Sequence, residues 1–279
     1  MRELSRLAVL GAGHVGPVIA RLAIKAGYPV AIATSGDPDD ITLITELVIP
    51  GAQPRWASDA VADADIVVLA IPLHRFGDID PALLDGTLVV DAMNYWPASD
   101  GVLSAFEDGG SSEVVARRLA GSAVVKALNH IGYHELEDRA RPAGAPDRRA
   151  AGVAGDDPAA VATIAGLVDR IGYDPVRLGS LRAGRVLQPG GPVFGIVLPL
   201  PEFEQAVREE ARSLTDIHLR ARHLRRPQQR RRWHAAVARP DVKLADLTAL
   251  GFSERFGELA TAGFPGAGSY MGAKASIGL

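Results

Sequence analysis

The sequence predicts a doubly wound α/β fold, in which helices cover both faces of a parallel sheet. Short apolar runs alternate with segments that carry apolar residues at helical spacing between residues 7 and 177. The runs are almost continuously apolar, as expected for strands that are buried on both faces. The first run also leads directly into a glycine-rich turn and then a helix. Together these features are typical of strand–helix–strand units packed side by side.

The first four elements form two strand–helix pairs. Leu7–Leu10 is apolar throughout, and His14–Ala26 repeats valine, isoleucine and leucine at helical spacing, so we expect a strand followed by a helix. Tyr28–Thr34 is the second apolar run. Pro38–Leu47 begins with a proline, which suits the first turn of a helix because an N–H group there has no partner within the helix.

The later strands are again short and aliphatic. They are expected at Ile66–Ile71, Thr87–Asp91, Ala123–Leu128, Ala150–Ala154 and Tyr173–Arg177. The helices between them, which repeat apolar residues at helical spacing, are expected at Ser112–Leu119 and Pro158–Ile171. Proline, glycine and charged residues concentrate in one loop, Arg139–Asp147.

The character of the sequence changes after about Pro199, because no further strand-like run follows. We predict one long amphipathic helix at Glu202–Leu224 and a second helix at Asp241–Ala260. The chain therefore divides into an α/β domain, residues 1–199, and a helical C-terminal extension, residues 200–279. The long helix has an apolar stripe that must be buried, on the α/β domain or on the partner subunit of a homodimer: Phe203, Val207, Leu214 and Ile217.

The composition excludes several classes of chemistry. The 279 residues include no cysteine, which excludes disulfides, thiolate nucleophiles and cysteine-ligated metals. The net charge of −3 gives no argument for a nucleic acid partner. The longest apolar runs, Ile66–Leu73 and Val193–Leu200, are far shorter than the roughly 20 residues that cross a bilayer. We expect a cytoplasmic protein with no membrane contact, whose redox chemistry would come from an organic cofactor.

The glycine-rich turn carries the first functional signal. Gly11-Ala12-Gly13-His14-Val15-Gly16 places three glycines directly between a strand and a helix. Gly11 permits the tight turn, Gly13 lets a diphosphate approach the backbone, and Gly16 lets the helix pack close to the strand. The helix N-terminus supplies free N–H groups, to which His14 adds its backbone N–H. This pattern predicts a Rossmann-type dinucleotide site.

The end of the second strand indicates which dinucleotide binds. An acid there would hold the ribose hydroxyl of NAD, but the strand ends in Thr34 and Ser35, whose hydroxyls suit the 2′-phosphate of NADP. Three aspartates follow at once, and the arginine that commonly pairs with this phosphate is missing. The same residues would also serve as a helix cap before Pro38, which is compatible with either cofactor.

Three other strand ends carry residues that suit a binding crevice. In open α/β sheets, ligands bind at the carboxyl ends of the strands. Ile71, Pro72 and Leu73 follow one strand and are expected beside the nicotinamide ribose. The ends of two further strands carry polar and aromatic groups: Ala92, Met93, Asn94, Tyr95 and Trp96, and then Asn129 and His130.

With these residues assembled, the chain resembles the coenzyme F420-dependent NADP reductases, which pass a hydride between a reduced deazaflavin and NADP. The resemblance spans residues 7–189 and depends on the order of several motifs: Gly11–Gly16, Ala33–Ser35, Val67–Pro72, Asp91–Trp96, Val124–His130, Gly155–Asp157 and Leu178–Leu181. The arginines that commonly follow Thr34 in this family are replaced by Ser35 and Gly36.

The resemblance implies NADP as cofactor and the deazaflavin as co-substrate, stacked on the nicotinamide near Asn94, Asn129, His130 and Gly132. Hydride transfer between stacked rings needs no protein nucleophile, so no catalytic residue is assigned with certainty. The expected cofactor-binding residues are Gly11, Gly13, His14, Val15, Gly16, Thr34, Ser35, Ile71, Pro72, Leu73, Ala92, Met93 and Asn94. The expected substrate-binding residues are Tyr95, Trp96, Asn129, His130 and Gly132.

Two other functions stay open. One is an NAD(P)H-dependent reductase of a different small substrate, such as an imine or a ketone. The other is a regulatory protein that binds NADP without turnover, because the sequence shows no obvious acid–base dyad. The arginine-rich stretch Arg220–Arg232 suits a solvated helix end, a polyanion site, or attraction of an anionic deazaflavin tail.

Several side chains have more than one interpretation. Lys126 is expected as a residue that snorkels at the edge of the sheet, or as a charge that faces the cofactor. Tyr95 and Trp96 would wall the deazaflavin pocket or pack under a loop. His134 is expected on a solvated turn, and we predict no metal site, because His130 and His134 would need a helix and a third ligand.

Overall fold

The computed structural model describes residues 5–101, 106 and 110–222, with only the backbone described for 213–222. The chain forms two compact units, Met1–Glu204 and Gln205–Leu279. The predicted helix at residues 241–260 and the arginine-rich stretch beyond residue 222 lie outside the described residues. The functional division at residue 199 stays a prediction.

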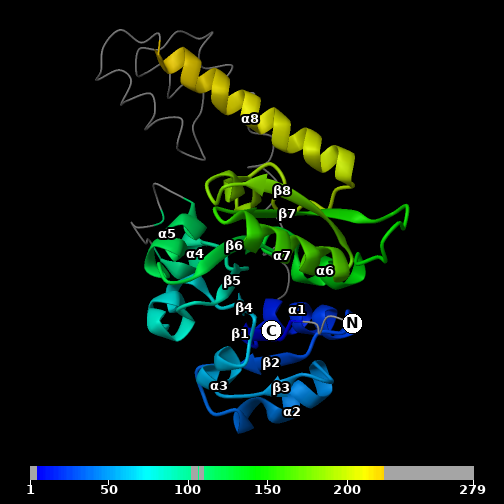
Figure 1. Ribbon diagram of the computed structural model, residues 1–279. Coiled ribbons are helices and arrows are strands. Elements are labelled where there is room, and N and C mark those ends of the chain that lie inside the picture. The colour runs from blue at the N-terminus through cyan, green and yellow to red at the C-terminus, as the bar shows by residue number, and fades with distance from the viewer. Residues whose placement is uncertain (1–4, 102–105, 107–109, 223–279) are drawn as a thin grey trace, which may run out of the picture. The chain divides into compact units, whose positions relative to one another are not determined.

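The first unit is built on one eight-stranded sheet, with the strands in the order β3-β2-β1-β4-β5-β6-β7-β8 (Figure 1). The first strand lies inside the sheet, where Leu7 is paired in parallel with Val30 on one side and with Ile66 on the other. This reversal of strand order confirms the predicted doubly wound fold. The strands are β1 (Leu7–Leu10), β2 (Val30–Ala33), β3 (Gln53–Pro54), β4 (Ile66–Leu69), β5 (Leu88–Asp91), β6 (Ala123–Ala127), β7 (Arg149–Gly155) and β8 (Tyr173–Gly179).

One junction in the sheet differs from the prediction of parallel strands throughout. Strands β6 and β7 are antiparallel, with Lys126 opposite Ala154, whereas β7 and β8 are again parallel. Between β6 and β7 the chain forms only the short helix α6 (Tyr133–Asp138), which packs on α1 (Val15–Lys25). A connection without a long crossover helix returns the chain at the edge where it left, so the next strand runs in the opposite direction.

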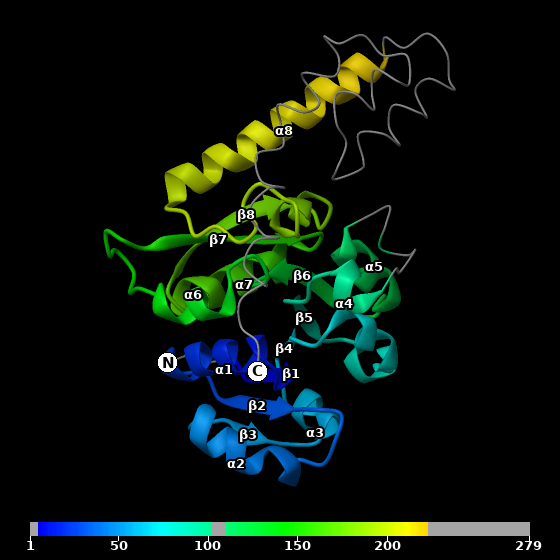
Figure 2. The same ribbon diagram turned by 180° about the vertical axis from the view of Figure 1, so that it is seen from behind.

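Helices lie on both faces of the sheet (Figures 1 and 2), and each face carries its own hydrophobic core. One contains Val9 and Val68 with side chains from α1 and α7, and the other contains Ala8 and Val67 with side chains from α3 and α5. Neighbouring residues of one strand thus face opposite cores, which explains why the inner strands β1 and β4 are apolar throughout. The remaining helices of this unit are α2 (Asp39–Val48), α3 (Ala57–Ala62), α4 (Pro97–Asp100), α5 (Ser111–Arg118) and α7 (Pro158–Arg170), with 3-10 helices η1 (Leu73–Asp78), η2 (Pro81–Leu84) and η4 (Ala183–Leu187).

The predicted long helix is present as α8 (Leu200–Arg222). Phe203 is fully buried, with its ring centroid 5.5 Å from that of His130, and Val207 is half-buried. The side chains of Leu214 and Ile217 lie outside the described residues, so burial of the whole stripe and assembly into a homodimer stay predictions. Among the described residues, no helix is long and apolar enough to span a membrane.

Candidate functional site

Two of the three glycines in the turn after β1 are required by the protein itself. Gly11 has φ +122°, and a Cβ atom there would lie 2.4 Å from the carbonyl oxygen of Ala70. A Cβ atom on Gly16 would lie 1.9 Å from the carbonyl oxygen of Gly11. Any larger residue at either position would force the backbone apart, so these glycines hold the turn, β4 and α1 in close contact.

Gly13 is different, because a Cβ atom there would meet nothing within 4 Å. The described protein therefore gives no packing reason for a glycine at this exposed position. Helix α1 begins at Val15, no side chain caps its first N–H groups, and its first turn holds no acidic residue. Free N–H groups and an open backbone are the features that a diphosphate needs, so the turn fits a dinucleotide.

A cavity of about 320 Å³ lies beside this turn, between α1 and α6. The imidazole of His14 forms part of its wall and stacks on Tyr133, with ring centroids 5.1 Å apart. Arg21 Nε donates to Glu137 across the cavity at 2.9 Å, and this hydrogen bond lowers the pKa of Glu137. Helix α6 thus forms the wall of the cavity opposite the glycine turn, and sequence patterns did not predict this contact.

Helix α6 itself corrects one prediction. His134 lies on this helix and not on an irregular turn, whereas His130 precedes it. Within the part of the chain that the structure describes, no group of three or more potential ligand residues could hold a metal ion.

The tip of β2 presents hydroxyl groups, as its sequence suggests. Thr34 is half-buried, its Oγ1 accepts the Gly36 N–H at 3.3 Å, and Ser35 is exposed. Asp37 uses its carboxylate locally, where Oδ1 accepts the Asp39 N–H at 3.0 Å. The nearest acidic residues thus lie at the start of α2 and not at the end of β2. The strand tip itself carries no carboxylate.

The predicted crevice residues after β4 and β5 divide into accessible and buried groups. Pro72 is exposed, and Ile71 and Asn94 are half-buried. The side chains of Leu73, Ala92 and Met93 are buried in the core, so only their backbone could face a ligand. These three residues support the site from beneath and do not line it with their side chains.

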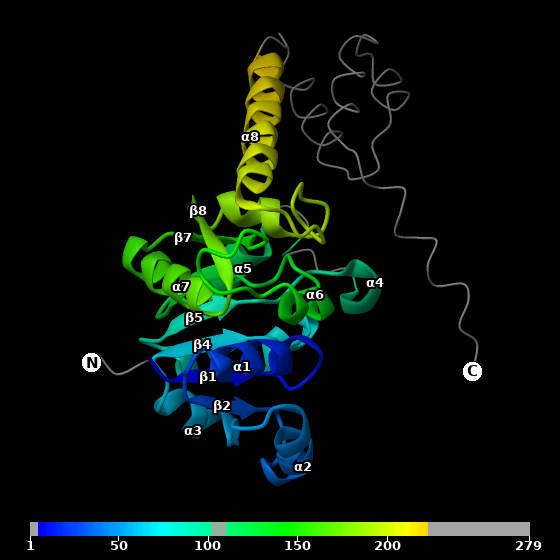
Figure 3. The same ribbon diagram turned by 90° about the vertical axis from the view of Figure 1, so that its right-hand side faces the viewer.

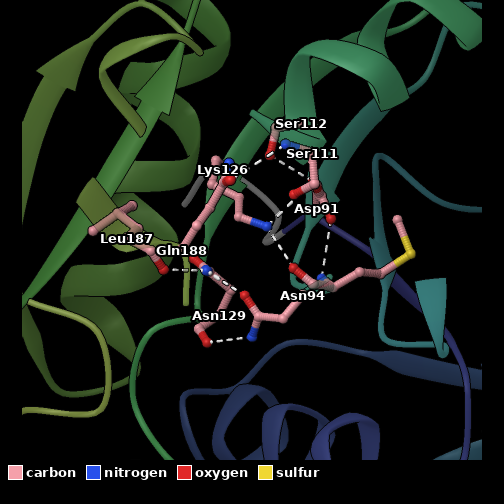
Figure 4. Close-up of polar contacts among 9 residues, drawn as sticks. Asp91, Asn94, Ser111, Ser112, Lys126, Asn129, Leu187 and Gln188 are labelled. Atoms are coloured by element: carbon pink, nitrogen blue, oxygen red, sulfur yellow. Dashed lines mark hydrogen bonds and ion pairs between the residues drawn. The ribbon is translucent and has the colours of Figure 1, made fainter. Parts of the chain in front are cut away.

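Asn94 and Asn129 join the ends of β5 and β6 (Figure 4). Asn94 Nδ2 donates to the backbone carbonyl of Asn129 at 2.8 Å, and Asn129 Nδ2 donates to Asn94 Oδ1 at 2.9 Å. Leu128, between β6 and Asn129, has φ +61°, a left-handed conformation that is unusual for a bulky residue. The turn at Leu128 therefore directs Asn129 toward Asn94 at a conformational cost, which is common at functional sites.

Behind this asparagine pair lies a buried ion pair (Figure 4). Lys126 Nζ lies 3.3 Å from Asp91 Oδ2 and also donates to the carbonyl of Met93. Asp91 Oδ1 accepts the Met93 N–H at 3.0 Å, and its Oδ2 accepts the Ser112 hydroxyl at 2.6 Å. Burial lowers the pKa of Lys126, and the Asp91 carboxylate opposes that shift. Lys126 is an internal residue between β5 and β7, so the expected snorkelling conformation is wrong.

Three buried polar atoms around this network have no hydrogen-bond partner among the described residues: Ser111 Oγ, Asn129 Oδ1 and Gln188 Nε2. Gln188 Oε1 accepts the Ser111 N–H, which joins the segment after η4 to the start of α5. Buried polar atoms without partners are rare in proteins. They mark the asparagine pair and its surroundings as a place where a polar ligand group could bind.

His130 has a different position from the one expected. The residue is 1% exposed, and its ring Nε2 accepts the Gly152 N–H at 3.1 Å. Burial lowers its pKa to about 4, and the backbone of Val193 opposes this shift. The ring joins the end of β6 to β7 inside the core, and in this structure it does not line an open crevice.

The aromatic pair after β5 is also divided. The Tyr95 hydroxyl donates to the carbonyl of Gly101 at 3.0 Å and its ring packs on Phe106, which agrees with packing under a loop. Trp96 is exposed on one side and its ring lies against Phe194, with centroids 5.5 Å apart. Gly132 is exposed at the start of α6. Of the expected substrate-binding residues, Trp96 and Gly132 are therefore the most accessible.

The structure also brings together two residues that sequence patterns did not single out. His74 Nδ1 lies 2.7 Å from Asp100 Oδ1, and Asp100 Oδ2 accepts the Trp96 N–H at 2.7 Å. The two residues are 26 positions apart and on different loops. The one sequence signal for a contact between His74 and Asp100 is that each residue follows one of two neighbouring strands, β4 and β5.

Comparison with known proteins agrees with this geometry. Residues 6–95 match the model of the family described as NADP oxidoreductase, coenzyme F420-dependent. The predicted family resemblance is confirmed. The matched segment includes the glycine turn, the tip of β2 and the loop that ends at Tyr95. No curated protein gives a significant match to the sequence.

Solved structures extend the similarity beyond the matched segment. The hypothetical protein SMa0349 from Sinorhizobium meliloti is 29% identical, with 70% of this chain and 96% of that chain covered and a TM-score of 0.63. A protein from Arthrobacter sp. FB24, named provisionally as an F420-dependent NADP reductase, is 25% identical, with 69% and 98% covered and a TM-score of 0.58. The first unit thus has a Rossmann-type α/β fold.

Proposed function

We propose that the protein transfers a hydride between the reduced deazaflavin coenzyme F420 and NADP. The observation that carries this proposal is the open backbone at Gly13, in a turn that matches the F420-dependent NADP oxidoreductase family. A glycine without a packing role, directly before an uncapped helix, is explained by the approach of a diphosphate.

In the proposed complex, the turn from Gly11 to Gly16 holds the diphosphate through backbone N–H groups. Thr34 and Ser35 receive the 2′-phosphate at the tip of β2. The backbone after β4, at Ile71 and Pro72, and the amide of Asn94 face the nicotinamide. NADP supplies the position on its nicotinamide ring that accepts or donates a hydride.

The protein's part is to place the two rings in contact and to keep water away. The hydrogen bonds between Asn94 and Asn129 fix the two strand ends on which the second ring would rest. The buried pair of Asp91 and Lys126 holds Met93, the residue before Asn94, by both its N–H and its carbonyl. Rigid support of this kind supplies orientation, which is a large part of catalysis by proximity.

The test is to mix the full-length protein with the reduced deazaflavin and NADP and to follow the absorbance of the deazaflavin. We expect the absorbance of the oxidised deazaflavin to return in proportion to the NADPH formed. A parallel reaction with the Gly13→Val variant should be much slower, because its side chain blocks the diphosphate. No oxidation of the deazaflavin by the parent protein would refute the proposal.

A further inference from the structure

His74 and Asp100 form a dyad at the carboxyl edge of the sheet. The imidazole Nδ1 and the carboxylate Oδ1 are 2.7 Å apart, the Asp100 side chain is 3% exposed, and the His74 side chain is 41% exposed. A carboxylate can only accept a hydrogen bond, so Nδ1 is the donor, and in the neutral form of the ring the lone pair lies on Nε2. Within the described part of the chain, Nε2 has no recorded partner.

The dyad lies between two loops that frame the candidate site. His74 follows Pro72 and Leu73 on η1, after β4, and Asp100 ends α4, after β5. Asp100 also accepts the N–H of Trp96, the most exposed aromatic residue of the second loop. Figure 3 shows α4 at the same edge of the sheet as α6 and the turn between β1 and α1. The imidazole therefore lies at the edge of the sheet where the proposed function expects the nicotinamide and the second substrate.

Other charged groups around His74 are engaged elsewhere. On η1 itself, Arg75 Nε donates to Asp78 at 2.6 Å. From α5, Arg118 donates to the carbonyls of Gly77 and Ile79, which holds the end of η1 in place. Asp100 is therefore the charged group that orients the His74 ring in this part of the described structure.

We propose that His74, oriented by Asp100, is the acid–base residue of the second-substrate site; this rests on the proposed function. When a reduced organic partner gives a hydride, with its electron pair, to the oxidised nicotinamide, the partner must also lose one proton. His74 Nε2 accepts that proton and passes it to water, while Asp100 stabilises the imidazolium. In the opposite direction, the imidazolium returns the proton to the partner as the hydride arrives from the reduced nicotinamide.

The arrangement has the parts that proton transfer needs. The buried Asp100 carboxylate accepts the hydrogen bond from Nδ1 and so fixes the orientation of the imidazole ring, as in other carboxylate–histidine pairs. The His74 side chain is half-exposed, so solvent or a substrate can reach the ring. A dyad that only tied the two loops together would have the same hydrogen bonds, so the experiment must detect the movement of a proton.

The experiment uses full-length His74→Ala, Asp100→Asn and a control, Asp78→Asn, which removes an exposed carboxylate on the same 3-10 helix. We expect His74→Ala to lower kcat with the reduced deazaflavin and NADP by about 100-fold. Free imidazole should then raise the kcat of this variant by about tenfold. Asp100→Asn should give a smaller loss, and Asp78→Asn should match the parent. NADP affinity, measured by fluorescence, should change less than about twofold in all three, because the dyad does not hold the dinucleotide.

A second readout does not depend on turnover. In the parent, proton NMR should show the hydrogen-bonded Nδ1–H of His74 far downfield, and Asp100→Asn should move that signal upfield because an amide oxygen is a weaker acceptor than a carboxylate.

The outcomes separate the two proposals. If the parent turns over the deazaflavin but His74→Ala is equally fast, or is slow and not rescued by imidazole, the acid–base role is wrong while the proposed function stands. If the parent turns over a ketone or an imine with NADPH but no deazaflavin, the proposed function is wrong, and the same rescue test with that substrate decides the dyad. If the parent turns over none of these, both proposals are wrong.

Discussion

Asp91 and Lys126 form an ion pair 3.3 Å long between neighbouring strands, with both side chains 0% exposed. Because the pair also binds both backbone groups of Met93, it fixes the chain at the point where β5 meets the candidate site. A buried charge pair contributes less to stability than its Coulomb energy suggests, because both groups lose their hydration. Its position is better explained by the precise support that it gives to Asn94.

Breaking the ion pair should therefore cost much more stability than replacing both of its partners. We expect Lys126→Met alone to lower the free energy of unfolding by about 3–5 kcal/mol, because it leaves Asp91 charged and unpaired in the core. The double variant Asp91→Asn with Lys126→Met should recover most of that loss. Urea unfolding of the parent, both single variants and the double variant would measure the coupling. A coupling energy near zero would show that the pair is not formed in solution.

The glycine turn predicts opposite effects for two alanine substitutions. Gly13→Ala should leave the unfolding free energy nearly unchanged, since its methyl group meets no atom of the described protein, but it should weaken NADP binding by about tenfold or more. Gly16→Ala should lower the free energy of unfolding by about 1–3 kcal/mol, because its methyl group would overlap the carbonyl of Gly11. Thermal unfolding and calorimetric titration with NADP distinguish the two. Equal NADP affinity in Gly13→Ala and the parent would place the diphosphate elsewhere.

Much of the fold follows from patterns within short segments. The apolar runs and the glycine turn predicted the positions of seven strands, because both faces of the inner strands are covered and the periodicity is local. The short β3 at Gln53–Pro54 carries no such signal, and the antiparallel direction of β7 depends on how the preceding connection packs. Such features arise from tertiary contacts, which a single sequence does not display.

The candidate site shows the same limit at the level of single residues. The motifs identified Asn94 and Asn129 as neighbours of the site, and the structure joins them by hydrogen bonds. They did not indicate that His130 is buried or that Lys126 is internal, because a polar residue in an apolar run can face the core or the solvent. Only the three-dimensional partners, Gly152 for His130 and Asp91 for Lys126, decide between these orientations.

Burial of His130 predicts a loss of stability in mild acid. The pKa of His130 is about 4 in the folded protein, against 6.5 for the free group. Between pH 4 and pH 6.5 the unfolded chain therefore binds a proton at this residue that the folded chain does not bind. Stability is retained above pH 6.5 and should fall by about 3 kcal/mol as the pH decreases toward 4. His130→Gln should flatten this part of the profile, and His134→Gln, which removes an exposed ring, is the control. Urea midpoints from pH 4 to pH 7 that follow the same slope in the parent and His130→Gln would contradict the assignment.

The tip of β2 predicts a preference for NADP over NAD. Thr34 and Ser35 present hydroxyl groups and no carboxylate, so the 2′-phosphate should gain hydrogen bonds without repulsion from the strand tip. Replacing both residues by alanine should reduce the ratio of the two affinities on the order of tenfold, since hydrogen bonds to a charged group contribute about 1.5–3 kcal/mol. Calorimetric titration of parent and variant with each cofactor measures this ratio. The prediction is wrong if the parent binds both cofactors equally.

Direct hydride transfer is tested most directly with a reduced deazaflavin in which both hydrogens on the hydride-donating carbon are deuterium. The full-length protein is mixed with this reduced coenzyme and NADP in ordinary water, and the NADPH is analysed by mass spectrometry and NMR. We expect one deuterium atom on the nicotinamide ring of each NADPH molecule, because the hydride passes between stacked rings without exchange with solvent. NADPH that carries only hydrogen from water, or no NADPH at all, would contradict the proposed function.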